Sequence, residues 1–230
     1  MNRILLADDD VELADMLVEY LGHEGFKVDA AHDGKTALEK AINDDYELII
    51  LDVMMPELNG FDVLRQLRTH SQVPVLMLTA RGEDVDSIVG LEIGADDYLA
   101  KPCNPRVLVA HMRAILRRSE AVTATAPSTA DILNIGDIEL QRGARRVLRN
   151  KQSLTLTSTE YRVLEVLLED AGHVVSKKDL SERALGRELN LYERSLDMHV
   201  SNLRKKLGPL DDGEERIKTI RGVGYQYIRP

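Results

Sequence analysis

Residues 47–52 read ELIILD, a short run in which four consecutive apolar side chains precede an aspartate. A run of this length that is apolar throughout is typical of a strand covered on both faces of its sheet. A second run of the same kind, PVLML, occupies residues 74–78. Together these runs favour a parallel sheet that is covered by helices on both sides.

The same alternation extends outward through the first half of the chain. Five apolar segments are each followed by a helical pattern, with helices expected from about residues 11, 35, 61, 83 and 106. The segments are RILLA (3–7), FKVDAA (26–31), ELIIL (47–51), PVLMLTA (74–80) and DDYLA (96–100). Strands that alternate with helices predict an α/β fold, here a five-stranded, doubly wound parallel sheet.

The second half has a different pattern. Residues 119–130 read SEAVTATAPSTA, a small, polar and proline-containing stretch that predicts a flexible linker between domain 1–118 and domain 131–230. Weakly alternating segments from Ile132 to Thr155 suggest an antiparallel sheet. Thr157 and Glu160 form a predicted capping box at the start of a helix. Two further helical patterns, SKKDLSERAL (176–185) and YERSLDMHVSNLRKKL (192–207), precede the hairpin pattern RIKTIRGVGYQYIRP. This order predicts an α+β winged helix-turn-helix.

Composition limits the class of protein. The 230 residues, 43% hydrophobic and 30% charged, suffice for two ordinary cores. The sequence shows no signal-peptide pattern and no long apolar stretch, and its one cysteine, Cys103, excludes an internal disulfide framework, so we expect a cytoplasmic protein without a membrane segment. The net charge of −9 averages unlike halves, because residues 1–120 carry 12 basic and 23 acidic side chains whereas the remainder has a net charge of +2. The acidity therefore does not argue against nucleic acid binding by the second half.

Polar side chains gather where the predicted strands end. Asp8–Asp10 follow the first strand, Asp52 ends the third, Thr79 ends the fourth, and Lys101 follows the fifth. Ligands of open parallel sheets bind outside these carboxyl ends. Converging carboxylates repel one another unless a cation joins them, and oxygen ligands with room for phosphate suit Mg²⁺.

Such a site could make a carboxylate the nucleophile toward a phosphoryl group, giving an aspartyl phosphate. Positioning and charge neutralisation by Mg²⁺ and Lys101 would supply most of the catalysis. An aspartate after a strand is more often only the N-cap of the next helix. The coincidence of residue type and position at four strand ends favours the functional interpretation.

The motifs ILLADDD, LDVMMPELNG, MLTARG and GADDYLAKP resemble the flavodoxin-like receiver domain of two-component response regulators. The resemblance implies Asp52 as phosphoacceptor and a sensor histidine kinase as donor. It implies Mg²⁺ held by Asp8, Asp9, Asp52 and the Met54 backbone carbonyl. It also implies that Thr79 and Lys101 contact the phosphoryl oxygens, that Tyr98 acts as a switch, and that Lys101 and Pro102 are joined by a cis bond.

The last predicted helix has an apolar stripe and a polar face rich in side chains that contact DNA in other proteins. LTSTEYRVLEVL, RSLDMHVSNLRKKL and TIRGVGYQY resemble the OmpR/PhoB class of winged-helix regulators, and most of all the CpxR-type envelope-stress regulators. The resemblance implies contacts to double-stranded DNA, with RNA polymerase as a possible further partner. The implied DNA contacts are Arg194, Ser195, His199, Asn202, Arg204 and, from the hairpin tip, Arg221. A solvated surface helix and a purely structural His199 are the alternatives for this segment.

The class usually forms homodimers through the fourth helix, fifth strand and fifth helix of the receiver. Ser87 and Val107 replace both members of one charge pair usual there, and His111 replaces an arginine. We therefore expect a more apolar contact that involves Ile88 and Val107. The remaining candidate charges are Asp96, Asp97, Arg113, Arg117 and Arg118.

Three functions compete. The first is a phosphorylation-switched transcription factor, which would not be a turnover enzyme although it could lose its phosphoryl group slowly. The second is an aspartyl-phosphate phosphatase, but that class needs a carboxylate two residues after the nucleophile, where this chain has Met54. The third is a constitutive DNA-binding protein with a vestigial receiver, which the intact set Asp8, Asp9, Asp52, Thr79 and Lys101 disfavours.

Overall fold

The computed structural model describes residues 1–80, 84–120, 132–187 and 195–229. They divide into two compact units, residues 1–116 and residues 117–230. Among the described helices, none combines the length and apolarity needed to cross a bilayer.

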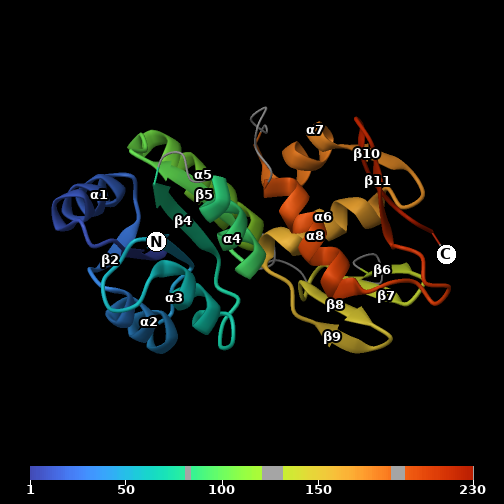
Figure 1. Cartoon of the computed structure of the whole chain (residues 1–230), viewed down its shortest axis with the longest axis horizontal. Coiled ribbons are helices and arrows are strands. Elements are labelled where there is room, and N and C mark those ends of the chain that lie inside the picture. Colours follow the sequence, from blue (N-terminus) through green and yellow to red (C-terminus); the bar gives the residue numbers. More distant parts are fainter. Residues whose placement is uncertain (81–83, 121–131, 188–194, 230) are drawn as a thin grey trace. The chain divides into compact units, whose positions relative to one another are not determined.

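The first unit is the predicted doubly wound sheet (Figure 1). Its strands pair in parallel in the order β2-β1-β3-β4-β5. The strands are β1 (Arg3–Ala7), β2 (Lys27–Ala31), β3 (Leu48–Asp52), β4 (Val75–Ala80) and β5 (Asp97–Lys101). The helices are α1 (Val11–His23), α2 (Gly34–Asn43), α3 (Gly60–Leu67), α4 (Asp84–Ile93) and α5 (Pro105–Glu120). Every residue of β3 is buried, as its continuous apolar run predicts.

Helices cover both faces of this sheet. Leu17 of α1 and Met112 of α5 belong to one apolar cluster with Ile4 and Ile50, so α1 and α5 lie on the same face. Helices α2, α3 and α4 pack in succession, α2 against α3 and α3 against α4, on the opposite face. The helices cover the two faces of the sheet and leave the carboxyl ends of its strands uncovered. In doubly wound sheets, ligands bind at these ends.

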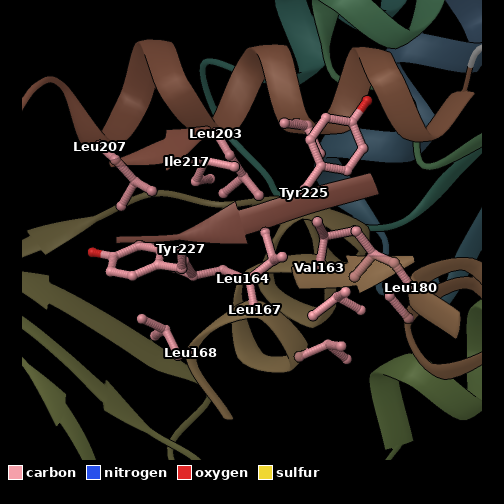
Figure 2. Packing of buried hydrophobic residues seen from close by; sticks show 14 of the residues in the cluster. Val163, Leu164, Leu167, Leu168, Leu180, Leu203, Leu207, Ile217, Tyr225 and Tyr227 are labelled. Atoms are coloured by element: carbon pink, nitrogen blue, oxygen red, sulfur yellow. The ribbon is translucent and has the colours of Figure 1, made fainter. Parts of the chain in front are cut away.

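The second unit is an α+β winged helix, as predicted. It contains a four-stranded antiparallel sheet in the order β6-β7-β8-β9 and a three-stranded sheet in the order β10-β12-β11. The first sheet comprises β6 (Ile132–Ile135), β7 (Ile138–Gln141), β8 (Arg146–Arg149) and β9 (Gln152–Leu154). The rest comprises α6 (Ser158–Glu169), β10 (Val174–Ser176), α7 (Lys177–Leu180), α8 (Ser195–Leu207), β11 (Ile217–Ile220) and β12 (Gly224–Tyr227). Its core is formed between α6, α8 and the β11–β12 hairpin (Figure 2).

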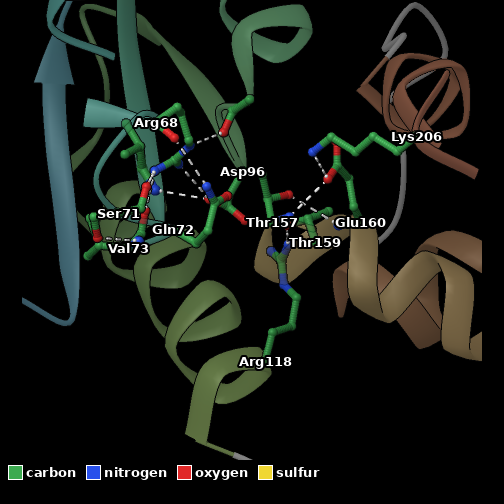
Figure 3. Close-up of polar contacts among 12 residues, drawn as sticks. Arg68, Ser71, Gln72, Val73, Asp96, Arg118, Thr157, Thr159, Glu160 and Lys206 are labelled. Atoms are coloured by element: carbon green, nitrogen blue, oxygen red, sulfur yellow. Dashed lines mark hydrogen bonds and ion pairs between the residues drawn. The ribbon is translucent and has the colours of Figure 1, made fainter. Parts of the chain in front are cut away.

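The predicted capping box is present at the start of α6. Thr157 Oγ1 accepts from the Glu160 backbone, and Glu160 Oε2 accepts from the Thr157 backbone at 2.9 Å. Lys206 Nζ of α8 also donates to Glu160 Oε2 at 2.6 Å (Figure 3). The cap therefore joins two helices of the second unit as well as starting one.

Two boundaries differ from the sequence prediction. Helix α5 continues through Ser119 and Glu120, the first two residues of the predicted linker, and residues 121–130 lie outside the described residues. The helix predicted at 176–185 begins at Lys177 and changes after Leu180 to a π-helical turn, Ser181–Leu185. Local periodicity does not distinguish these two helical forms.

Candidate functional site

Three carboxylates meet at the carboxyl edge of the parallel sheet of the first unit. Asp8 follows β1 and Asp52 ends β3, and the two strands are direct neighbours. Carboxylate oxygens of Asp8, Asp9 and Asp52 all lie within 4.8 Å of one another. Asp8 and Asp52 are buried, whereas Asp9 is exposed. The structure thus brings together the acidic residues that were predicted to converge.

Lys101 lies between the two buried carboxylates. Its Nζ is 2.6 Å from Asp8 Oδ2 and 2.6 Å from Asp52 Oδ2. Burial lowers the pKa of Lys101, but the carboxylates of Asp52 and Asp8 outweigh it and leave that pKa raised. Lys101 therefore stays positively charged beside Asp52 at neutral pH.

Burial has the opposite effect on the acceptor. It raises the pKa of Asp52, and Asp8 adds to the increase, although Lys101 and the Met54 backbone N–H oppose it. The cause is the cost of holding a negative charge away from water next to a second carboxylate. Asp52 is thus a buried carboxylate that ionises less readily than an ordinary aspartate.

The backbone around Asp52 is held by two tight approaches. Val53 N donates to Leu78 O of β4 at 3.0 Å, and Gly60 N donates to Val53 O at 2.9 Å. A Cβ on Gly60 would lie 2.1 Å from the Asp52 carbonyl oxygen, so no other residue fits there without a shift of the loop. These contacts fix the segment that presents Asp52 and Met54.

The remaining predicted receiver residues lie around this centre. Thr79 is buried one residue beyond Leu78, the β4 partner of Asp52. The Met54 backbone N–H lies 3.4 Å from Asp52 Oδ1, while the Met54 side chain is exposed. Tyr98 is half-buried on β5, and the Lys101–Pro102 peptide bond is cis, as the resemblance implies.

The donor set fits a small divalent cation. All candidate ligands are oxygens, and Asp8 Oδ2 is buried in an ion pair with Lys101, with no further hydrogen-bond partner among the described residues. Mg²⁺ favours such a set, in which one or two carboxylates leave positions for water and phosphate. Asp10 plays another role, because its side chain caps α1 by accepting from Leu13 N at 3.0 Å.

One neighbour of the site was missed from the sequence. His32 follows β2, and its Nδ1 lies 3.1 Å from the carbonyl oxygen of Asp8. Its position just past Ala31, at the same edge of the sheet, was the signal that could have identified it. The contact supports the backbone of the acidic pair and does not involve a carboxylate.

We expect the cost of the buried charge to appear in the stability of the receiver. A carboxyl group whose pKa is raised by folding lowers the free energy of unfolding as the pH rises above the pKa of the unfolded state. The pKa of Asp52 is raised in this way, so Asp52→Asn should remove the loss. In EDTA at pH 7, Asp52→Asn should therefore raise the free energy of unfolding of the receiver and with it the Tm. Thermal unfolding followed by circular dichroism measures this, and the difference should shrink in acid. A lower Tm for Asp52→Asn at pH 7 would show that Lys101 fully offsets the charge.

The second unit presents its predicted DNA-binding elements unequally. Arg221 is exposed at the turn between β11 and β12, where Val223 N donates to Ile220 O at 3.0 Å. Arg204 of α8 is partly exposed, and Arg194 lies outside the described residues. Arg221 at the hairpin tip is therefore more accessible than Arg204.

Three further predicted DNA contacts, Ser195, His199 and Asn202, lie on α8. They recur at intervals of four and three residues, beside the stripe that carries Leu196, Val200 and Leu203. They stay predicted DNA contacts.

Two acids predicted as charges of the dimer face have partners within the first unit. Asp96 Oδ2 accepts from Val75 N at 3.0 Å and lies 3.4 Å from Arg68 Nη2 (Figure 3). Asp97 Oδ2 lies 2.9 Å from His111 Nδ1. Both acids have partners in their own chain and cannot be counted as charges held for a second subunit.

The other candidate charges differ among themselves. Arg113 pairs with Glu24 at 2.7 Å, Arg118 is buried, and Arg117 is exposed. Val107 is 43% exposed and Ile88 is half-buried. The side chain of Ser87 lies outside the described residues. The described part of this face thus presents Val107, Ile88 and Arg117, whereas Asp96 and Asp97 are paired within the chain.

Comparison with known proteins agrees with both units. Residues 4–113 match the family described as "Response regulator receiver domain", and residues 151–227 match "Transcriptional regulatory protein, C terminal". The chain is 48% identical to "Transcriptional regulatory protein CpxR" of Klebsiella pneumoniae over 99% of both chains. It is 37% identical to "Response regulator ArlR" of Staphylococcus epidermidis over 98% of this chain and 99% of that one. A solved structure of a RitR mutant aligns with a TM-score of 0.76 at 27% identity, covering 99% of both chains.

The acidic edge with Lys101 and the winged-helix fold agree with these family matches, and the relatives match this chain over almost its whole length. The chain therefore belongs to the response regulators, with a receiver domain followed by an OmpR/PhoB-type DNA-binding domain, and it regulates transcription.

Proposed function

We propose that this response regulator accepts a phosphoryl group on Asp52 from a sensor histidine kinase, and that phosphorylation promotes dimerisation and operator binding. The observation that carries the proposal is the position of Lys101 Nζ, 2.6 Å from carboxylate oxygens of both Asp52 and Asp8. A vestigial receiver would have no need to bury this charged set. We place the receiver at 1–118, the linker at 119–130 and the winged helix at 131–230, with helix α5 continuing into the first two residues of the linker.

In the proposed reaction, an oxygen of Asp52 forms a bond to phosphorus while the bond between phosphorus and the donor breaks. Lys101 neutralises charge on the phosphoryl oxygens, because its ammonium already lies beside Asp52. Asp8, Asp9, Asp52 and the Met54 carbonyl would hold Mg²⁺, which when bound offsets negative charge on the carboxylates and the incoming phosphoryl group.

The proposed switch follows from the same site. The hydroxyl of Thr79, buried at the end of β4, would donate to the phosphoryl group, and Tyr98 on β5 would respond to that movement. Met54 offers no acid two residues after Asp52, so release of the phosphoryl group should be slow. A long-lived acyl phosphate suits a signal rather than turnover.

Operator selection tests the proposed function. The full chain is incubated with random duplex DNA, with and without acetyl phosphate and Mg²⁺, and bound DNA is sequenced. We expect phosphorylation to enrich repeats spaced by roughly one helical turn, and Asp52→Asn to lose that gain. Equal enrichment and affinity under both conditions would contradict phosphorylation control. RNA polymerase recruitment would be tested by transcription from the selected operator.

The dimer is proposed to use α4, β5 and α5 with a largely apolar contact. Val107 is the large apolar side chain of α5 that is most exposed. Val107→Glu should therefore weaken dimerisation of the phosphorylated protein by about tenfold or more, since burying an unpaired charge is costly. Analytical ultracentrifugation of the phosphorylated protein measures this. Unchanged association of the Val107 variant would place the interface elsewhere.

A further inference from the structure

Asp197 of α8 connects three elements of the winged helix. Its carboxylate accepts a hydrogen bond from the hydroxyl of Tyr225 on β12. The same carboxylate lies 2.6 Å from Nζ of Lys177, the first residue of α7. Asp197 thus joins the predicted DNA-facing helix to the strand that follows the wing.

Tyr225 is buried among apolar residues except at this polar end. The residue is 3% exposed, and Figure 2 shows it between its strand and the helix that carries Leu203 and Leu207. Lys177 Nζ lies 5.8 Å and the Arg204 guanidinium carbon 6.0 Å from the centre of its ring. Both distances allow a cation–π attraction. Burial raises the pKa of Tyr225, and the Asp197 carboxylate raises it further, so the hydroxyl remains a donor.

Arg204 connects α8 to the other strand of the hairpin. Its Nε and Nη2 donate to Ile217 O at 2.8 Å and 2.6 Å, and Nη2 also donates to Thr219 Oγ1 at 2.8 Å. A guanidinium held by three hydrogen bonds has a fixed direction. Helix α8 is therefore attached through polar side chains to β12 by Asp197 and to β11 by Arg204, on either side of the Arg221 turn.

We propose that Lys177, Asp197, Arg204 and Tyr225 form a clamp that fixes the wing relative to α8, so that wing and helix bind DNA as one unit. Asp197 and Arg204 are positioning residues here, and the prediction that Arg204 contacts DNA is replaced by this role. The inference rests on DNA binding by the winged helix and adds how its two contacting elements are coupled. Without the clamp, the wing could take a range of positions. Ordering it on binding would then offset part of the binding free energy that Arg221 contributes.

A double-mutant cycle tests the coupling. Tyr225→Phe removes the hydroxyl and keeps the ring, and Arg221→Ala removes the wing cation. Dissociation constants are measured for the full chain and one duplex, taken from the operator selection, at several salt concentrations. In the parent protein, Arg221→Ala should weaken binding about tenfold and lower the salt slope by about one. In the Tyr225→Phe background, the same change should cost less than about threefold.

Two comparisons make the result specific. Tyr161→Phe is the matched control, because Tyr161 is a buried tyrosine of the same unit whose hydroxyl has no hydrogen-bond partner among the described residues. It should leave the Arg221 effect unchanged. Asp197→Asn supplies a second clamp variant if Tyr225→Phe folds poorly, and it should also reduce the Arg221 effect.

The clamp is overturned if Arg221→Ala costs the same factor in all backgrounds. It is also overturned if Asp197→Asn relaxes the preference at one base pair while the Arg221 effect persists, because Asp197 would then read a base directly. Failure of the parent protein to bind any selected duplex would instead count against DNA binding itself.

Discussion

Lys101→Met should slow phosphorylation of Asp52 by about 10²–10³-fold, because it removes the cation that lies 2.6 Å from the acceptor oxygen. The measurement is the initial rate of acyl-phosphate formation from acetyl phosphate at saturating Mg²⁺, followed by intact-protein mass spectrometry. Lys27→Met, at an exposed lysine of β2 away from the carboxylates, is the matched control and should react at the parent rate. A Lys101 variant within about threefold of the parent would remove the lysine from the proposed chemistry.

The same variant predicts a change with pH. The pKa of Asp52 is raised by burial and by Asp8, and Lys101 opposes both effects. Loss of the lysine should therefore raise the pKa further. Since the ionised carboxylate is the nucleophile, the pH below which the rate falls should move upward in Lys101→Met. A pH–rate profile without this displacement would mean that Lys101 does not act on the Asp52 charge.

Arg216→Met should destabilise the winged helix by about 3–5 kcal/mol, because it leaves a partly buried carboxylate without its main partner. The Arg216 side chain is 2% exposed. Its Nη1 and Nη2 donate to the two carboxylate oxygens of Asp137, with a distance of 2.8 Å from Nη2 to Oδ2. Its Nε donates to Gly208 O at 3.1 Å. Arg149 Nε reaches the same carboxylate at 3.1 Å. This cluster connects the turn between β6 and β7 with β8, with the residue before β11 and with the end of α8.

Denaturant unfolding with Lys218→Met as the control measures this effect. Lys218 lies two residues further along the chain, on β11, and pairs with Glu214 at 2.6 Å. That pair is exposed, so its loss should cost less than about 1 kcal/mol. Burial raises the pKa of Asp137, but Arg216 and Arg149 outweigh it and hold that pKa below its usual value. The stabilisation is thus present above the unfolded pKa and lost as the pH falls through the folded one. Equal losses in the two variants would contradict a special role for the buried pair.

The receiver was predictable because its information is local. Each buried parallel strand is an apolar run, and parallel strands end at the same edge of the sheet. The sequence alone therefore predicts that Asp8, Asp52 and Lys101 lie close together. The capping box of Thr157 and Glu160 is equally local, since its two residues are three apart.

The winged-helix contacts were less predictable because they depend on partners distant in sequence. Asp197 is an example, because its partners Lys177 and Tyr225 lie on α7 and β12, and local helical periodicity does not place these elements beside it. Asp97 was predicted to be an interface charge because the sequence does not show that β5 and α5 bring it beside His111.

The most direct test of the account is the location of the phosphoryl group. The full chain is phosphorylated with acetyl phosphate and Mg²⁺, reduced with borohydride, which converts an aspartyl phosphate to homoserine, and digested for tandem mass spectrometry. The account predicts homoserine at position 52, dependent on Mg²⁺. Homoserine at another aspartate, or none at position 52 in protein that gains a phosphoryl mass, would contradict the assignment of Asp52 as the acceptor.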